Sequence, residues 1–313
     1  MRLAALRDAL SPSIRQPPPP TQPPLSAGSV YALLAYGSWG LLPIYWKFFT
    51  QSSPVEVLCH RMIWSSVFLS GLLLLQQRQA EIRTLLKSRQ ALGMLLGSAA
   101  LLTFNWGLYI YGVNTDRVVE TSLGYYINPL VSVLLGAVVL KEQLRRGQQI
   151  AVGLAAIGVG YFIWQFGAVP WIALGLAFSF AFYGLVRKVV AVAPMVGLAV
   201  ETLLITPAAL TLVVYWGVTG AGNFGSSGSL LTLLFIGAGV VTSMPLLWFN
   251  NAAKRLRLST LGFFQYLAPS VQLMLGVFLY GEPFTPTHII TFSFIWVALL
   301  LYSTTSLMER KVI

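Results

Sequence analysis

Ten apolar segments of near-bilayer length follow one another along the chain, and short stretches between them carry most of its charged residues. A helix needs about 20 apolar residues to cross the hydrocarbon core, so each segment is long enough for one crossing. The predicted spans are residues 29–48, 54–76, 91–112, 118–140, 147–165, 170–187, 194–217, 229–250, 257–280 and 285–305. The pattern predicts an all-α membrane protein with ten transmembrane helices.

The distribution of basic residues predicts the orientation of these spans. An even number of spans puts both termini on one side, and Lys and Arg gather in the cytoplasmic segments. With the N-terminus in the cytoplasm, 17 of the 20 basic residues fall in inner segments. The other three, Lys47, Arg61 and Arg117, lie at the outer ends of spans. We therefore expect a multi-pass protein of the bacterial inner membrane with both termini cytoplasmic.

Composition agrees with a chain whose surface faces lipid. Hydrophobic residues make up 56% of the 313 positions and charged residues only 9%, against about 25% charged in soluble domains. The net charge of +11 is explained by topology, since the basic residues stand singly or in pairs, and no nucleic-acid partner is expected. Residues 1–28, with four consecutive prolines, are predicted to form a disordered proline-rich cytoplasmic tail.

The two halves of the chain resemble each other at an offset of 140 to 141 residues. Pro54 and Pro194 open the second and seventh spans. In the fourth and ninth spans the pairs are Tyr126 and Tyr266, Pro129 and Pro269, and Gly136 and Gly276. Because five is odd, the halves must insert with opposite orientation, which is typical of transporters with a midplane site. We predict a first five-helix repeat at 29–165 and a second at 166–313, the latter with a short cytoplasmic C-terminus.

Four ionisable residues inside the spans are the main candidates for substrate binding or coupling. A charge at the centre of a membrane helix costs about 2.5–3.5 kcal/mol, so each one needs a reason. Glu56 and His60 share a helix face, and Arg61 follows directly. Glu201 is the repeat partner of His60 at an offset of 141 and of Arg61 at 140. The alternative for Glu56 is an interfacial pair with Arg61 or Lys47 that merely orients the helix.

The fourth span concentrates polar and aromatic residues around Pro129, which can kink the helix or release a carbonyl. We predict four cavity-lining residues there: Glu120, Tyr125, Tyr126 and Asn128. Glu120 has the alternative of pairing with Arg117 near the interface, and the tyrosines have that of lipid or ordinary core contacts.

Metal and cofactor chemistry finds no support in the sequence. There is one cysteine, Cys59, and the two histidines, His60 and His288, lie far apart. HExxH and P-loop patterns are absent from the sequence, so no metal, no cofactor and no ATP-driven step is expected.

Several strings together resemble the RarD branch of the EamA, or drug/metabolite transporter, superfamily. They are EVLCHRMIWS at 56–65, VETSLGYYINPLVSVLLG at 119–136, LGLAFSFAFYGLVRK at 174–188, ETLL at 201–204, GFFQYLAPS at 262–270, and FTP at 284–286 followed by TFSFIWVAL at 291–299. The resemblance covers about Tyr31 to Tyr302. It implies ten helices, a five-plus-five inverted repeat, secondary transport and the traditional label of a chloramphenicol permease.

The functional hypothesis is a permease that moves a small organic metabolite or drug by alternating access and is not an enzyme. Its partners would be the substrate, the lipid bilayer and a coupling ion, with protons favoured over sodium because His and Glu are available. Two other classes stay open. An intramembrane enzyme would need a converging nucleophile–base or metal-ligand set, and a membrane scaffold or sensor would leave the repeat and the buried charges unexplained.

Overall fold

The computed structural model describes residues 27–139, 141, 143–144, 146–190, 192–256, 260–261 and 264–308. Of these residues 84% are helical and none lies in a strand, which confirms the all-α prediction. The predicted tail at 1–28 lies outside the described residues, except for Ala27 and Gly28, which already belong to the first helix.

Helices occupy parts of all ten predicted segments. They are α2 (Ala27–Lys47), α3 (Pro54–Leu75), α5 (Arg89–Asn114), α6 (Val118–Val139), α7 (Arg146–Phe166), α8 (Trp171–Val189), α9 (Pro194–Thr219), α10 (Ser229–Ala253), α12 (Leu267–Met274) with its π-helical continuation η1 (Leu275–Leu279), and α13 (Pro286–Met308). The start of the ninth segment includes residues 257–259 and 262–263, which lie outside the described residues.

The short helix α4 (Gln79–Lys87) was not predicted. It is too short to cross a bilayer, and none of its residues is fully buried. Its Ile82 and Leu85 pack against apolar side chains of the neighbouring helices, while Arg78 and Glu81 form an exposed ion pair. It is an amphipathic helix within the connection between α3 and α5.

Local sequence signals explain where the two site-bearing helices begin. Both α3 and α9 have proline at the first helical position, Pro54 and Pro194. Proline is favoured there because the missing N–H would have no intrahelical partner. Ser53 adds an N-cap by accepting a hydrogen bond from the backbone N–H of Val55 at 3.3 Å.

Seven of the described helices are long and apolar enough to cross a membrane: α3, α5, α6, α7, α9, α10 and α13. Apolar but shorter stretches are Trp171–Arg187 in α8 and Leu267–Leu279 in α12 and η1. Helix α2 is 21 residues long; its glycine, serine, tyrosine and tryptophan residues lower its hydropathy. The described residues thus contain seven candidate spans, as expected of a multi-pass membrane protein.

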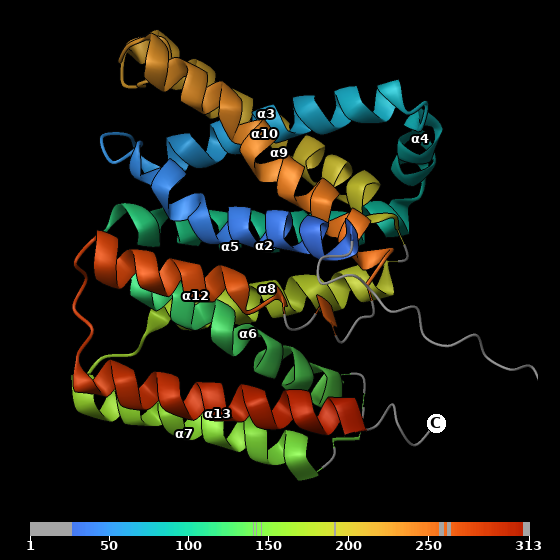
Figure 1. Cartoon of the computed structure of the whole chain (residues 1–313). Coiled ribbons are helices and arrows are strands. Elements are labelled where there is room, and N and C mark those ends of the chain that lie inside the picture. Colours follow the sequence, from blue (N-terminus) through green and yellow to red (C-terminus); the bar gives the residue numbers. More distant parts are fainter. Residues whose placement is uncertain are drawn as a thin grey trace, which may run out of the picture.

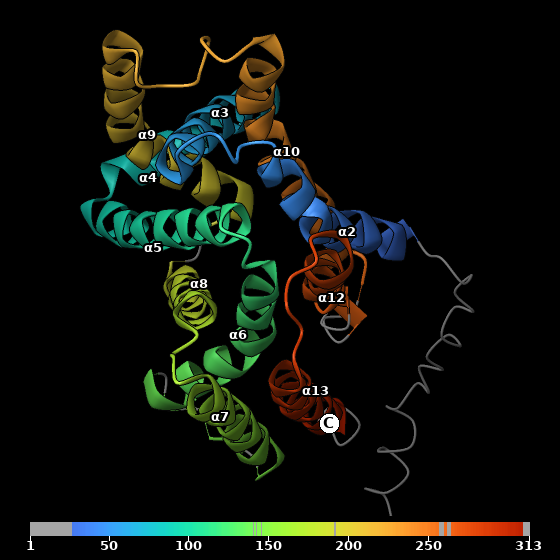
Figure 2. The same cartoon turned by 90° about the vertical axis from the view of Figure 1, so that its left-hand side faces the viewer.

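The helices lie side by side with α3, α9 and α10 at one edge and α7 and α13 at the other (Figure 1). Helix α6 packs on α8 and α12 packs on α2, while α5 packs on α8 and α10 packs on α2. In addition α3 packs on α9, α6 on α12 and α7 on α13. Viewed from the end in Figure 2, α5, α8 and α6 lie on one side, with α2 and α12 on the other. Most of the strongest contacts therefore join one half of the chain to the other.

Candidate functional site

Arg61 lies in α3 two turns after its N-terminal proline and is only 4% exposed. Its Nε–H donates a hydrogen bond to Thr242 Oγ1 on α10 at 3.0 Å. The guanidinium carbon lies 3.8 Å from the ring centre of Trp106 on α5 and 4.9 Å from that of Trp46 on α2. Cation–π contacts of this kind compensate part of the cost of burying the charge. Four helices therefore meet at this guanidinium.

The Arg61 charge lacks an anionic partner in the structure. No Asp or Glu carboxylate of the described part of the chain lies within ion-pair distance of it. Its Nη1 is buried and makes no hydrogen bond to any described residue. The hydroxyls of Tyr45, Tyr109 and Tyr125 are the titratable groups that interact electrostatically with the guanidinium. The site is a buried cation walled by aromatic rings, with part of its donor capacity unused.

Glu201 lies in α9 and its side chain is fully buried. Its carboxylate accepts hydrogen bonds from Ser98 Oγ on α5 at 2.6 Å and from Tyr183 on α8 at 3.2 Å. Arg187 Nη1, also on α8, lies 3.5 Å from the carboxylate. That guanidinium lies directly over Gly197, one turn before Glu201. Glu201 is thus a paired buried charge, in contrast to Arg61.

The structure places Glu56 against the loop between α9 and α10. One of its oxygens accepts hydrogen bonds from the backbone N–H groups of Asn223 and Phe224, at 2.6 and 3.2 Å. The other accepts one from Asn223 Nδ2 at 3.0 Å. The alternative of pairing with Arg61 or Lys47 is not seen in the described residues, where Lys47 pairs with Asp116 instead. Glu56 therefore anchors the loop.

His60 points into an aromatic cluster. Its ring lies 4.5 Å from that of Phe224 and 4.4 Å from that of Phe235, measured between ring centres. Neither ring nitrogen has a hydrogen-bond partner among the described residues, and the side chain is buried. Glu56 and His60 thus both contact Phe224, whereas Glu201 pairs with residues of α5 and α8, so the four predicted residues do not form one site.

Glu120 pairs with Arg117, which is the alternative to a cavity-lining role that the sequence left open. It also accepts hydrogen bonds from the backbone N–H groups of Ile172 and Ala173, at 3.0 and 3.5 Å, in the first turn of α8. A carboxylate at a helix N-terminus satisfies orphan donors and complements the helix dipole. In this structure Glu120 therefore ties α6 to α8.

The other residues of the fourth span face different neighbours. Tyr125 packs edge-on against Tyr109 at 5.6 Å and so borders the Arg61 site. The hydroxyl of Tyr126 shares a 2.5 Å hydrogen bond with Ser270 of α12. Asn128 donates to the carbonyl of Ala177 in α8 at 3.0 Å. Among these three, only Tyr125 lies beside a predicted charged residue.

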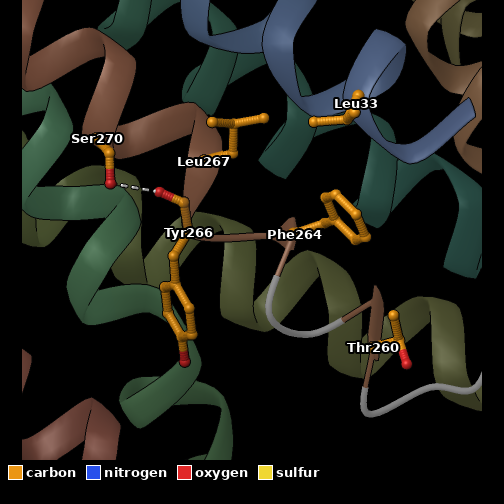
Figure 3. Close-up of a pocket in the computed structure, with 6 residues that line it drawn as sticks. All are labelled: Leu33, Thr260, Phe264, Tyr266, Leu267 and Ser270. Carbon is orange, nitrogen blue, oxygen red and sulfur yellow. Dashed lines mark hydrogen bonds between the residues drawn. The ribbon is translucent and has the colours of Figure 1, made fainter. Parts of the chain in front are cut away.

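A pocket of about 400 Å³ opens beside the start of α12 (Figure 3). It is lined by Leu33, Thr260, Phe264, Tyr266, Leu267 and Ser270. Ser270 Oγ donates to the Tyr266 carbonyl at 2.7 Å, the bond dashed in Figure 3, and also bonds Tyr126. The lining is mostly apolar and includes neither Arg61 nor Glu201.

Sequence reasoning missed most partners of the two buried charges. Trp46, Trp106 and Thr242 carry no local signal, because only the packing of α2, α5 and α10 brings them to Arg61. Arg187 was counted as a cytoplasmic charge, and its contact with Glu201 depends on how α8 meets α9. No three His, Cys, Asp or Glu side chains come together as a metal site in the described ranges.

Comparison of the sequence with known proteins identifies the family to which the chain is similar. Residues 26–164 match the model of the EamA-like transporter family. The chain is 46% identical over 275 residues to protein RarD of Salmonella typhi, covering 88% of this chain and 94% of that protein. It is 28% identical over 278 residues, 88% of this chain and 92% of the other, to a Pseudomonas aeruginosa protein named chloramphenicol-sensitive protein RarD.

A solved crystal structure shares the fold. It aligns with a TM-score of 0.56 and 16% identity, covering 88% of this chain and 97% of the other. Sequence identity over nearly the full length, the family match and the helical architecture agree with the resemblance carried by the quoted strings. The chain therefore belongs to the RarD branch of the EamA, drug/metabolite transporter superfamily.

Proposed function

We propose that this protein is a secondary active transporter that moves a small organic metabolite or drug across the bacterial inner membrane by alternating access. Membership of a transporter family supports transport in general. The observation that carries the mechanism is a pair of buried charges, Arg61 and Glu201, at repeat-equivalent positions seven residues after Pro54 and Pro194.

We further propose ten spans arranged as two inverted five-helix repeats, 29–165 and 166–313. Under this assignment α2 corresponds to α8, α3 to α9, α5 to α10, α6 to α12 and α7 to α13. The contact of α6 with α8 then has its counterpart in α12 with α2, and that of α5 with α8 in α10 with α2. Three further contacts, α3–α9, α6–α12 and α7–α13, each join a helix to its own repeat partner. This pairing of equivalent contacts is expected when a two-fold axis in the membrane plane relates the two repeats.

The orientation follows from the same assignment. The connections α2–α3, α7–α8, α9–α10 and α12–α13 gather at the left-hand end in Figure 1, and α4 lies at the other end. Basic residues such as Arg78, Arg83 and Lys87 accompany α4. By the positive-inside rule the α4 end is cytoplasmic, and we assign both termini to that side.

The roles of the charged residues differ in this proposal. Arg61 binds the substrate, because its guanidinium has unused donors at the meeting point of four helices. Glu201 couples transport to protons, because protonation of its carboxylate weakens its attraction to Arg187. His60, with both ring nitrogens unpartnered, is a second candidate proton carrier. Glu56 and Glu120 hold the outer ends of helices in place.

Counterflow in liposomes tests the proposal. The purified full chain, reconstituted and loaded with one member of a metabolite and drug panel that includes chloramphenicol, is expected to exchange that compound with label outside. Exchange that saturates, and that responds to an imposed pH gradient, supports proton-coupled transport. Folded protein that exchanges no compound of the panel counts against transport and in favour of a scaffold or sensor. Chemical conversion of a panel compound would indicate an enzyme.

A further inference from the structure

We infer that the substrate bound at Arg61 is a small organic monocarboxylate with an apolar or aromatic body. This inference rests on the proposed transport function and deepens it by naming the substrate class. It is carried by the geometry around one buried guanidinium, which among the described residues has two ring contacts and a single hydrogen-bond partner but no anion.

Two tryptophan rings and one hydroxyl already contact the Arg61 guanidinium. Trp106 and Trp46 lie against the π-surface at 3.8 and 4.9 Å, and Thr242 takes the Nε–H at 3.0 Å. Nη1 remains buried without a partner among the described residues. A carboxylate matches the in-plane N–H fork of arginine and would bind at this unused edge. The rings thus hold the fork in one orientation and leave its donors for a ligand.

Two other unpaired polar groups near Arg61 can donate hydrogen bonds. The Trp46 ring that contacts the guanidinium has a buried Nε1–H without a partner in the described ranges. The Tyr109 hydroxyl interacts electrostatically with Arg61 and is likewise buried and unpaired. Buried donors without acceptors are costly, typically by about 1–3 kcal/mol each. An acceptor-rich ligand group would relieve several of them at once.

The charge balance favours a monoanion. A single unpaired arginine is neutralised by one negative charge, so a dianion such as phosphate would leave excess charge in the bilayer. A zwitterion would need a carboxylate for its ammonium group. The oxygens of Glu56 are taken by Asn223 and Phe224, and those of Glu201 by Ser98, Tyr183 and Arg187. Neither of these two carboxylates is therefore free to pair with an ammonium group, whereas Arg61 is free to pair with an anion.

The side chains around the guanidinium indicate the chemistry of the ligand beyond its carboxylate. Trp46, Trp106, Tyr109 and Tyr125 surround the guanidinium from α2, α5 and α6. Aromatic side chains bind apolar and planar groups by burial and edge or stacked contacts. A carboxylate on an aliphatic chain or ring matches both parts of the site.

Direct binding by the purified full chain in nanodiscs tests the inference without requiring flux. The probes are benzoate, phenylacetate and hexanoate, each compared with its amide and its amine. We expect at least one carboxylate to raise the unfolding midpoint and to quench tryptophan fluorescence, while the matched amide and amine do not. An amide or amine that binds as well as its carboxylate overturns the inference, and so does a set in which no carboxylate binds.

Two variants locate the binding at Arg61. Arg61→Gln should weaken carboxylate binding about ten- to a hundredfold, the loss expected for a charged hydrogen-bond pair. Tyr109→Phe removes one donor with little change in shape and should weaken it about fivefold. The matched control is Arg255→Gln, an exposed arginine stacked on Tyr31 at 5.2 Å, which should bind carboxylates like the wild type. Undiminished binding by both site variants overturns the assignment.

Binding and flux separate the two proposals. Carboxylate binding without counterflow would support the anion site and contradict the transport function. Counterflow of neutral compounds without carboxylate binding would support transport and contradict the anion site.

Discussion

At the scale of single residues, the contact between Arg187 and Glu201 depends on a missing methyl group. A Cβ at Gly197 would lie 1.7 Å from Arg187 Nη1, far inside van der Waals contact. The guanidinium therefore occupies the space that only glycine leaves on this turn of α9. Any larger residue at position 197 must displace the Arg187 guanidinium from its present position beside Glu201.

Gly197→Ala is therefore predicted to break the buried ion pair without altering either charged residue. Breaking a buried pair is strongly destabilising, because it leaves an uncompensated charge, and we expect counterflow to fall about tenfold or more. Gly217→Ala in the same helix is the matched control, since its Cβ would meet nothing within 4 Å. Equal flux in the two alanine variants would show that the pair has no role.

Replacement of Glu201 tests coupling. Glu201→Gln keeps a hydrogen-bonding side chain toward Ser98 and Tyr183 but removes the charge that faces Arg187. We expect exchange driven by a pH gradient to be lost or uncoupled, measured as uptake with and without the gradient. Tyr183→Phe keeps the carboxylate and should retain the response to the gradient. A Glu201→Gln protein with the pH response of the wild type would rule out this residue as the proton carrier.

The sequence singled out Arg61 and Glu201 because ionisable residues stand out in apolar segments. Their surroundings could not be read in the same way, since Thr242 lies 181 positions from Arg61. Glu56 shows the limit most clearly. Local spacing suggested Arg61 or Lys47 as its partner, whereas the structure pairs it with a loop 167 positions away. Helix spacing identifies which residues share a face, but only packing decides what that face meets.

At the scale of elements, a carboxylate from one half of the chain caps a helix of the other. Glu282, in the connection between η1 and α13, accepts hydrogen bonds from the backbone N–H groups of Val118 and Val119, both at 2.7 Å. These are first-turn donors of α6 without intrahelical partners. The contact fastens the start of α6 to the end of the α12–η1 segment.

Loss of this cap should destabilise the protein measurably. Glu282→Ala is expected to lower the free energy of unfolding by about 1–2 kcal/mol, in the range found for removed N-caps. Thermal unfolding in detergent, followed by circular dichroism, measures the change. Glu81→Ala in the exposed Arg78–Glu81 pair of α4 is the control and should leave the midpoint unchanged. A Glu282→Ala midpoint equal to that of the control would contradict the capping role.

Element positions were predictable to a large extent because each apolar segment is long and has a charge or a proline near at least one end. Pro54 and Pro194 begin helices where the segments begin. Helix α4 was missed since hydropathy alone does not reveal a nine-residue amphipathic helix. The π-helical turn at Leu275–Leu279 also carries no sequence signal that was recognised, and it follows Pro269 by less than two turns.

At the scale of the whole molecule, the proposed topology places the α9–α10 loop outside and α4 inside. Single cysteines test this in a Cys59→Ala background, where the one native thiol, which is buried, is removed. Ser226→Cys should react with a membrane-impermeant maleimide added to whole cells, and Thr84→Cys should react only after permeabilisation. Both positions are exposed in the structure. The reverse pattern, or labelling of both from outside, would contradict the ten-span orientation.

Alternating access requires that the buried site at Arg61 open to each face of the membrane in turn. Thr242→Cys, in the same Cys59→Ala background, puts a thiol at the atom that contacts the guanidinium. The most direct measurement is its reaction with sulfonatoethyl methanethiosulfonate in right-side-out and in inside-out vesicles. We expect modification in both preparations, and we expect a carboxylate that binds to slow it. Modification in only one preparation, or in neither, would contradict alternating access.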